Sequence, residues 1–161
     1  MNRIEHPIAP VYNHESQILI LGSFPSVKSR ENQFFYGHPQ NRFWKVLAQI
    51  FEDELPQTIA EKTEFLLKHQ VAVWDVIASC EIEGSSDSSI RNVVANDLGN
   101  LLDTAEIKQI YVNGKKAEQL YRKYIEPKTG RTAICLPSTS PANAAWSVKR
   151  LVEAWSVIKE S

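Results

Sequence analysis

The segment FFYGHPQNRFWKVL, which runs from Phe34 to Leu47, concentrates side chains that can take part in binding or catalysis. It combines aromatic rings with a histidine, a proline, an amide and an Asn-Arg pair, and an ordinary helix requires none of these. Two structural explanations are available: an aromatic patch of the core and a well-capped helix start. A functional site is the third, and the remaining loops decide among them.

The stretch GSFPS, from Gly22 to Ser26, has the composition of a tight turn after a strand. Glycine permits a close backbone approach, proline fixes the chain, and the hydroxyl groups of Ser23 and Ser26 can face an anion. An ordinary turn between a strand and a helix has the same composition, so the motif alone is weak evidence for an anion-binding site. The glycine spacing does not match the Gly-x-Gly-x-x-Gly pattern of a dinucleotide site.

The stretch LPSTSPAN is more specific, because three hydroxyl side chains lie between Pro137 and Pro141 directly before an expected helix. A helix start uses one hydroxyl, and small rigid hydroxyl loops can hold phosphates. Phosphate binding and simple capping are equally supported. Asn113, which precedes Gly114, is either a turn-forming residue or a fixed amide that reads the polar edge of a ligand.

The elements that position these loops can be predicted from hydrophobic patterning. Short apolar runs, typical of buried strands, occupy Gln17–Leu21, Val71–Trp74, Ile107–Val112 and Thr132–Leu136. Helical spacing covers 41–51, 58–69, 90–102, 117–125 and 142–158.

This alternation of strands and helices predicts a three-layer α/β fold, with a central, mainly parallel four-stranded sheet flanked by helices. Ligands bind such sheets outside the carboxyl ends of their strands, so the loops described above should gather at one edge. The serine-rich loop Gly84–Ser89 is expected to be a surface turn that caps the next helix, and we assign it no chemistry.

Bulk composition limits the class of protein. The chain has 161 residues, enough for one domain over residues 1–161 with a core that needs no disulfide or metal. Its net charge of −1 argues against coating nucleic acid by electrostatics alone, but a few phosphates can be held by backbone amides. Cys80 and Cys135 have no ligand-spaced neighbours, so we expect no metal site. Without an apolar leader or a run of roughly 20 apolar residues, we expect a cytoplasmic protein that does not contact a membrane. We also expect a monomer.

In this order, GSFPS, FYGHPQNRFW and LPSTSPAN resemble the uracil-DNA glycosylase superfamily, most closely its hypoxanthine-DNA glycosylase branch. The stretch Gly37–Trp44 also resembles the mismatch-specific uracil glycosylases, in which a similar His-Pro-x-Asn-Arg-Phe-Trp run occurs. The resemblance covers nearly the whole chain. It implies a monofunctional enzyme without a cofactor that flips a deaminated base out of DNA and hydrolyses its N-glycosidic bond. Hypoxanthine is the expected base, with uracil and xanthine as further candidates.

The resemblance also implies residue roles. Tyr36 matches the aromatic that stacks on the flipped base, with Phe24 as a second wall, and Asn113 contacts the base. Asn41 matches the asparagine on which this branch should depend most, since an amide can orient water and hold the base edge. His38 either assists the departing base or braces the loop, and bracing is slightly favoured. Contacts to the DNA backbone and duplex are expected from Ser23, Ser26, Ser138, Thr139, Ser140 and Asn143.

One departure from the family pattern affects the mechanism. Many superfamily members carry Asp or Asn in the first loop to handle water, whereas GSFPS offers only hydroxyl, aromatic and proline side chains. Water handling therefore moves to Asn41 or is weak, which suits a base that departs readily, such as a deaminated purine.

Two alternatives remain open. The first is the same chemistry on uracil or thymine opposite guanine, because small changes of shape around Phe24, Tyr36 and Asn113 separate such pockets. The second is a non-catalytic module that binds nucleotides or single-stranded nucleic acid through its aromatic edge. In either case Phe43 and Trp44, at the start of an apolar helix, are expected to belong to the core.

Overall fold

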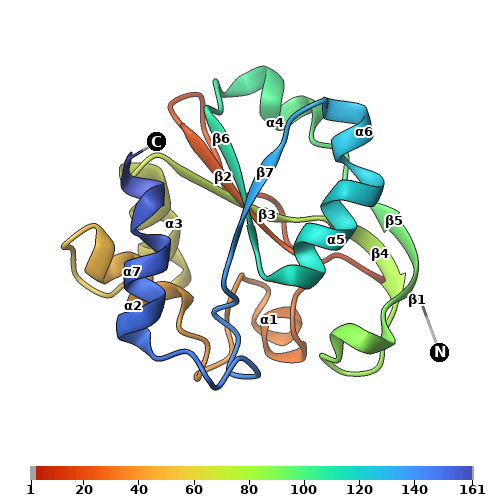
Figure 1. The fold of residues 1–161 in the computed structure, drawn as a ribbon, viewed down its shortest axis with the longest axis horizontal. Helices are drawn as coiled ribbons and strands as arrows, with labels where there is room; N and C mark the ends of the chain where they lie inside the picture. Colours follow the sequence, from red (N-terminus) through yellow and green to blue (C-terminus); the bar gives the residue numbers. More distant parts are fainter. Residues whose placement is uncertain (1–2, 161) are drawn as a thin grey trace.

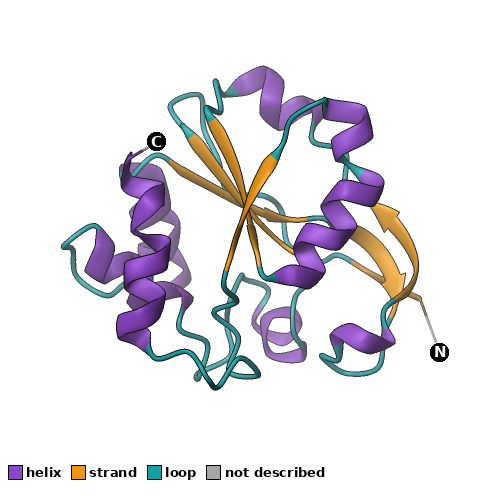
Figure 2. Ribbon diagram, viewed as in Figure 1, coloured by secondary structure: helices purple, strands orange, loops and turns teal. Residues whose placement is uncertain are grey.

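The computed structural model describes residues 3–160 and centres on a parallel sheet of four strands in the order β3-β2-β6-β7 (Figures 1 and 2). The strands run in register, with Ile18 opposite Val71 and Gly22 opposite Asp75. All four predicted apolar runs are strands, and the predicted fold class is confirmed. The strands are β2 (Ile18–Gly22), β3 (Val71–Asp75), β6 (Gln109–Asn113) and β7 (Ala133–Leu136).

Helices cover both faces of this sheet, because side chains of the central strand alternate between two apolar layers. Ile18 and Ile20 pack into one cluster with helices α2, α3 and α7, whereas Leu19 and Leu21 pack into the other with α4 and α5. Every residue of β2 is buried, so its apolar run is continuous rather than alternating. The helices are α1 (Val27–Asn32), α2 (Phe43–Ile50), α3 (Ile59–Lys68), α4 (Gly99–Thr104), α5 (Lys115–Tyr124), α6 (Glu126–Thr129) and α7 (Val148–Trp155), with 3-10 turns at Asp87–Ser89 and Ser156–Glu160.

The predicted helix over residues 90–102 is wrong in its first half. Arg91–Ala95 forms strand β5, which pairs antiparallel with β4 (Ile77–Glu81), and β4 in turn pairs with β1 (Arg3–Glu5). The β-branched pair in Arg-Asn-Val-Val-Ala favours an extended backbone, and β4 offers it backbone hydrogen bonds. Within the predicted segment only residues 99–102 are helical, as the first part of α4 (Gly99–Thr104).

The predicted helix over residues 142–158 begins later than expected. It starts at Val148, where the Ser147 hydroxyl accepts a hydrogen bond from the backbone N–H of Arg150 at 3.2 Å and caps the helix. The preceding residues stay in a loop because Arg42 binds their carbonyl groups, as described below. No helix between residues 3 and 160 is long and apolar enough to cross a membrane.

Trp155 ties α7 to the loop that follows β7. Its fully buried indole donates from Nε1 to the Pro137 carbonyl at 2.8 Å and meets the Phe43 ring edge-on at 5.9 Å. Since Pro137 begins the loop that leads to the hydroxyl-rich segment, this bond fixes where that loop starts.

We expect Trp155→Phe to lower the free energy of unfolding by about 1–3 kcal/mol, because the partly buried Pro137 carbonyl loses its donor. Urea unfolding monitored by circular dichroism measures the change. Trp146→Phe is the control: its half-buried ring stacks on Arg150 at 4.1 Å, and the expected loss is smaller. Equal losses for the two variants would show that the Trp155–Pro137 bond contributes little.

Candidate active site

A cavity of about 380 Å³ opens at the carboxyl ends of the strands, the place predicted from the sequence. Most of the predicted site residues share its lining. Asn143 lines a second cavity that adjoins the first, and His38 lines neither. Those in the first cavity are Ser23, Phe24, Ser26, Tyr36, Asn41, Asn113, Ser138, Thr139 and Ser140.

Asn41 enters the cavity from the turn before α2. Its Oδ1 accepts the backbone N–H of Phe43 at 2.9 Å, and its own N–H donates to the His38 carbonyl at 2.9 Å. Because only the amide oxygen can accept from an N–H, this bond fixes the orientation of the amide. Within residues 3–160 no partner engages Nδ2, so both of its N–H groups are available to a ligand.

Tyr36 lines the cavity with a ring that is supported from behind. Its ring stacks on Phe43 with centroids 3.9 Å apart and planes 15° apart, and its backbone adopts a φ of 52°. A non-glycine residue adopts this left-handed conformation at a cost, so the local packing must hold it there. Phe43 and Trp44 are buried in the core, as predicted.

The Tyr36 hydroxyl is buried and has no hydrogen-bond partner among the described residues. Burial, and then the negative charge of Asp75, raise the pKa of this phenol, while the neighbouring Asn113 amide opposes the rise. The phenol therefore stays neutral in the physiological range and keeps its proton for donation.

His38 lies on the turn that delivers Asn41. Its Nδ1 accepts the backbone N–H of Gln40 at 3.0 Å, and its carbonyl accepts that of Asn41. Both contacts hold the turn itself. This position is the one that a bracing role requires.

Asn113, at the end of β6, is locked against the loop that follows β7. Its Nδ2 donates to Thr139 Oγ1 at 3.0 Å, and its Oδ1 accepts the Thr139 backbone N–H at 3.1 Å. Thr139 is completely buried, which makes this paired contact a rigid link between the two strand ends. One N–H of the Asn113 amide is left for a ligand.

Arg42 organises the loop from Thr139 to Trp146. Its guanidinium donates to the Ser140 carbonyl at 2.7 Å, to the Asn143 carbonyl at 3.0 Å and to the Trp146 carbonyl, and Nε reaches the Thr139 carbonyl at 3.4 Å. The fork of donors on one arginine thus collects carbonyls that no helix or strand satisfies. Arg42 serves the loop rather than DNA.

The hydroxyls of this loop also shape it. Ser138 Oγ accepts the N–H of Ser140, and Ser140 Oγ accepts that of Ala142, each at 3.1 Å. Asn143 Nδ2 donates to the Ser138 carbonyl at 2.9 Å. The three-hydroxyl motif is therefore a self-supporting loop, and each hydroxyl that accepts a backbone bond keeps its own proton for a phosphate.

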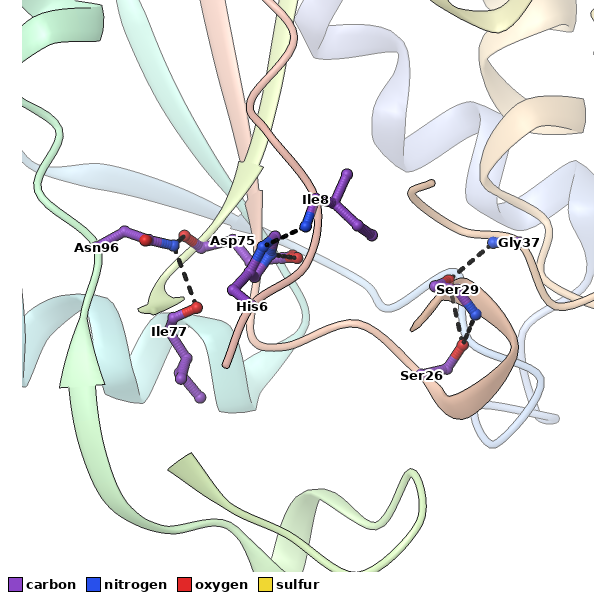
Figure 3. A network of polar contacts seen from close by, with 8 residues as sticks. All are labelled: His6, Ile8, Ser26, Ser29, Gly37, Asp75, Ile77 and Asn96. Carbon is purple, nitrogen blue, oxygen red and sulfur yellow. Dashed lines mark hydrogen bonds and ion pairs between the residues drawn. The ribbon is translucent and has the colours of Figure 1, made fainter. Parts of the chain in front are cut away.

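Ser26 caps α1 in the first loop, and Ser29 links that helix to the aromatic segment. Ser29 Oγ accepts the Gly37 backbone N–H at 2.9 Å, while Ser26 Oγ donates to Ser29 Oγ at 3.2 Å (Figure 3). This network joins the GSFPS loop to the segment that carries Tyr36. Ser23 Oγ donates to Asp87 Oδ1 at 3.4 Å across the cavity wall.

The serine-rich loop Gly84–Ser89 was expected to be a surface turn without chemistry, but residues 85–88 form one wall of the cavity. Ser85 Oγ accepts the Val27 N–H at 2.9 Å, and Arg30 donates to the Gly84 carbonyl at 2.8 Å. Burial raises the pKa of Asp87 in this wall. The prediction that the loop caps a helix is wrong, because strand β5 follows it, and only the β4–β5 pairing brings the loop to the cavity.

Asp75 and His6 are the site residues that the sequence did not single out. Asp75 ends β3, is 3% exposed and lies in the cavity lining. Its Oδ2 is 2.8 Å from His6 Nε2, and His6 Nδ1 accepts the Ile8 backbone N–H at 3.2 Å (Figure 3). The position of Asp75 directly after an apolar strand is a signal in the sequence, whereas nothing there predicts the contact with His6.

The second cavity, of about 630 Å³, shares Ser138 and Ser140 with the first and is also lined by Lys115, Lys116 and Asn143. Cationic side chains thus lie beside the hydroxyl loop. Within residues 3–160, no group of three or more His, Cys, Asp or Glu side chains is arranged to hold a metal ion.

The family model of the Uracil DNA glycosylase superfamily matches residues 9–159. The chain belongs to this superfamily. The resemblance seen in the three loop motifs is therefore confirmed, over almost the entire chain.

Relatives and a solved structure agree with this membership. A protein of Methanosarcina acetivorans named hypoxanthine DNA glycosylase is 34% identical over 157 residues, 96% of this chain and 98% of that protein. One of the same name from Methanosarcina barkeri is 33% identical over 149 residues, 91% and 92% of the two chains. The solution NMR structure of a proposed uracil DNA glycosylase from Methanosarcina acetivorans superposes with a TM-score of 0.81 at 30% identity, covering 96% of both chains.

We expect Arg42→Met to loosen the loop from Thr139 to Trp146 and to lower the free energy of unfolding by about 3 kcal/mol, since several partly buried carbonyls lose a charged donor. Hydrogen exchange read by mass spectrometry should show faster exchange in the peptide that contains this loop. Lys45→Met, which removes an exposed charge from the same helix, is the matched control. Unchanged exchange in Arg42→Met would mean that the loop holds its shape without the guanidinium.

Proposed function

We propose that the chain is a monofunctional DNA glycosylase that flips a deaminated base, hypoxanthine above all, into the first cavity and hydrolyses its N-glycosidic bond. The observation that carries the proposal is the joint presence of Tyr36, Asn41 and Asn113 in one cavity of a chain that belongs to this superfamily. The identity of 34% to a protein named hypoxanthine DNA glycosylase supports the choice of base.

Asn41 is proposed to contact both the departing base and the attacking water. As the bond between C1′ and the base nitrogen breaks, its electron pair moves to the base and positive charge develops on the sugar. The free Nδ2–H groups can donate to the departing base, where negative charge grows. The second lone pair of Oδ1 can hold the water that adds to C1′.

Tyr36 and Phe24 are proposed to bind the flat faces of the base. The stack of Tyr36 on Phe43 gives the ring a rigid backing, so little side-chain freedom is lost when a base packs on it. Phe24 is held by an edge-on contact to His6 at 5.9 Å and by Arg30 over its ring. The free N–H of Asn113 is then a donor toward the base edge.

The DNA backbone is proposed to lie across both cavities. Ser23 and Ser26 of the first loop, and Ser138, Ser140 and Asn143 of the hydroxyl loop, would contact phosphates or probe the duplex. The completely buried Thr139 would support that loop from within rather than reach the DNA. Lys115 and Lys116 add local positive charge where the net charge of the chain is −1. The proposed partner is DNA, and the proposed working form is a monomer.

A deoxyinosine-containing duplex provides the direct test of this function. We expect purified protein to release hypoxanthine and leave an abasic site, so that strand cleavage appears only after alkali. End-labelled duplexes with deoxyinosine, deoxyuridine, deoxyxanthosine or a G:T mismatch compare the bases, and deoxyuridine deserves inclusion because of the structural relative's description.

Cleavage without alkali would contradict the monofunctional mechanism. Activity confined to deoxyuridine or thymine would support the proposed reaction but contradict hypoxanthine as the preferred base. No release from any duplex by folded protein would leave the binding module as the better reading.

Asn41→Ala should lower the rate of base release ~10²–10³-fold, the usual effect of removing one preorganised donor. Because the Asn41 side chain also accepts the backbone N–H of Phe43, the first residue of α2, the variant should lose about 1 kcal/mol of stability. Asn41→Asp is the matched variant: its carboxylate still accepts the Phe43 N–H but offers no N–H of its own. Single-turnover excision on deoxyinosine should fall in both variants, with stability lost only in the alanine variant. Full activity in Asn41→Asp would exclude the proposed role of Nδ2.

A further inference from the structure

The Arg30 guanidinium is only partly satisfied by the contacts of the fold. Arg30 lies in the last turn of α1, and its Nη2 donates to the Gly84 carbonyl at 2.8 Å. Its Nη1 is buried and has no hydrogen-bond partner within residues 3–160, and no ion pair of this range includes it. A buried N–H group without a partner costs stability, so the fold alone does not explain an arginine at this position.

Two walls of the first cavity meet at this guanidinium. Its carbon Cζ lies over the ring of Phe24, 5.6 Å from the ring centroid, and Phe24 lines the cavity. The Gly84 carbonyl belongs to the serine-rich loop Gly84–Ser89, whose residues 85–88 line the same cavity. Arg30 lines neither cavity itself, so it contacts both walls from behind.

The serine-rich loop has few other contacts that hold it in place. Ser85 Oγ accepts the Val27 N–H at 2.9 Å, and Ser23 Oγ donates to Asp87 Oδ1 at 3.4 Å. The other hydrogen bonds of the loop stay within residues 83–90. Since Val27 and Arg30 both belong to α1, this helix carries the loop.

The position of α1 is set in turn by the aromatic segment. Ser29 is buried, and its Oγ accepts the Gly37 backbone N–H at 2.9 Å, next to Tyr36 (Figure 3). The neighbouring residues Ser29 and Arg30 therefore connect the same helix to different walls of the cavity. A base between Tyr36 and Phe24 would meet walls whose spacing α1 determines.

We propose that Arg30 is a positioning residue for base binding, whose guanidinium holds Phe24 and the serine-rich loop against the flipped base. The inference rests on the proposed function and deepens it, because it assigns the spacing of the base pocket to α1. Arg30 does not touch the base and acts through the two walls that it supports.

A guanidinium is suited to make both contacts at once. Its face is attracted to an aromatic ring, while its N–H groups donate in its own plane to a carbonyl beside that ring. A methionine has a similar length and packs in a similar way, but it offers neither charge nor donor. A lysine keeps the charge as a single ammonium without the planar group.

The test uses a duplex that binds without reacting. It carries 2′-fluoro-2′-deoxyarabinoinosine, in which the fluorine beside C1′ slows departure of the base, and the reference duplex has adenine at the same position. Dissociation constants are measured by fluorescence anisotropy, and their ratio gives the preference for the deaminated base. In Arg30→Met this preference should fall about tenfold, the combined effect of losing a ring contact and a charged hydrogen bond.

The rate of the reaction and the stability should respond much less. Walls that hold the base equally before and during bond cleavage contribute to binding rather than to the maximal rate. The maximal single-turnover rate of Arg30→Met on deoxyinosine should therefore stay within about threefold of wild type. The urea midpoint of unfolding should not fall, because the variant removes a buried N–H group that has no partner.

Lys28→Met is the matched control, since Lys28 is an exposed cation of the same helix that pairs with Glu31 at 3.6 Å. Loss of its charge should weaken both duplexes alike and leave the preference intact. Hydrogen exchange in the peptide that spans residues 83–90 should become faster in Arg30→Met and remain unchanged in Lys28→Met.

Four results would overturn the inference. They are an unchanged preference in Arg30→Met, unchanged exchange in its serine-rich loop, a loss of stability in parallel with the loss of preference, and full preference in Arg30→Lys. The third would show that Arg30 serves the fold, and the fourth that charge alone is enough.

Failure of the proposed function can be told apart from failure of this inference. Wild-type protein that releases no hypoxanthine from deoxyinosine would overturn the proposed function. An active wild-type protein with an unchanged Arg30→Met variant would overturn the role of Arg30 alone.

Discussion

The geometry of the site depends most on the hydrogen bonds that the Arg42 guanidinium donates to the loop after β7. Arg42 stands at the start of α2 and binds carbonyls from Thr139 to Trp146, so it joins the aromatic segment to a loop almost a hundred residues away. The carbonyls of an irregular loop have no N–H partners in a helix or sheet. The planar guanidinium, with its several charged donors, supplies the hydrogen bonds that they lack. With this link in place, Asn41 on one side and Ser138, Thr139 and Ser140 on the other line the same cavity.

Around that link, the cavity combines rigid walls with a few free polar atoms. Tyr36 stacks on Phe43, Asn113 is hydrogen-bonded to Thr139, and Asn41 Oδ1 accepts the backbone N–H of Phe43. Each side chain nevertheless keeps a group for a ligand. Tyr36 offers a ring face, Asn113 one N–H and Asn41 two N–H groups. Such preorganisation is what a site needs when catalysis consists of orienting a water and stabilising charge rather than forming a covalent bond. Asp75 also lines the cavity, and its carboxylate is hydrogen-bonded to His6 of the N-terminal segment.

Much of the fold could be read from local pattern. Continuous runs of Val, Ile and Leu predicted the strands of the central sheet, because strands buried on both faces need apolar side chains at every position. The three-stranded sheet of β1, β4 and β5 was not predicted. Its pairing of residues 3–5 with residues 79–81 is a long-range contact between short, partly exposed segments. For the same reason the sequence did not place the serine-rich loop at the cavity, nor His6 beside Asp75.

The sequence by itself determined the strand positions, the strand-end location of the site and the identity of its motifs, because these depend on residue type and on spacing within single segments. Only the tertiary structure decided which side chains have atoms left for a ligand. The Asn41 amide, the Ser138 hydroxyl and Arg42 all appear available in the sequence, yet each is partly or wholly engaged by backbone groups. Asp75 appears to be an ordinary strand end and proves to be a buried acceptor, because its burial and its partner arise from segments distant in the chain.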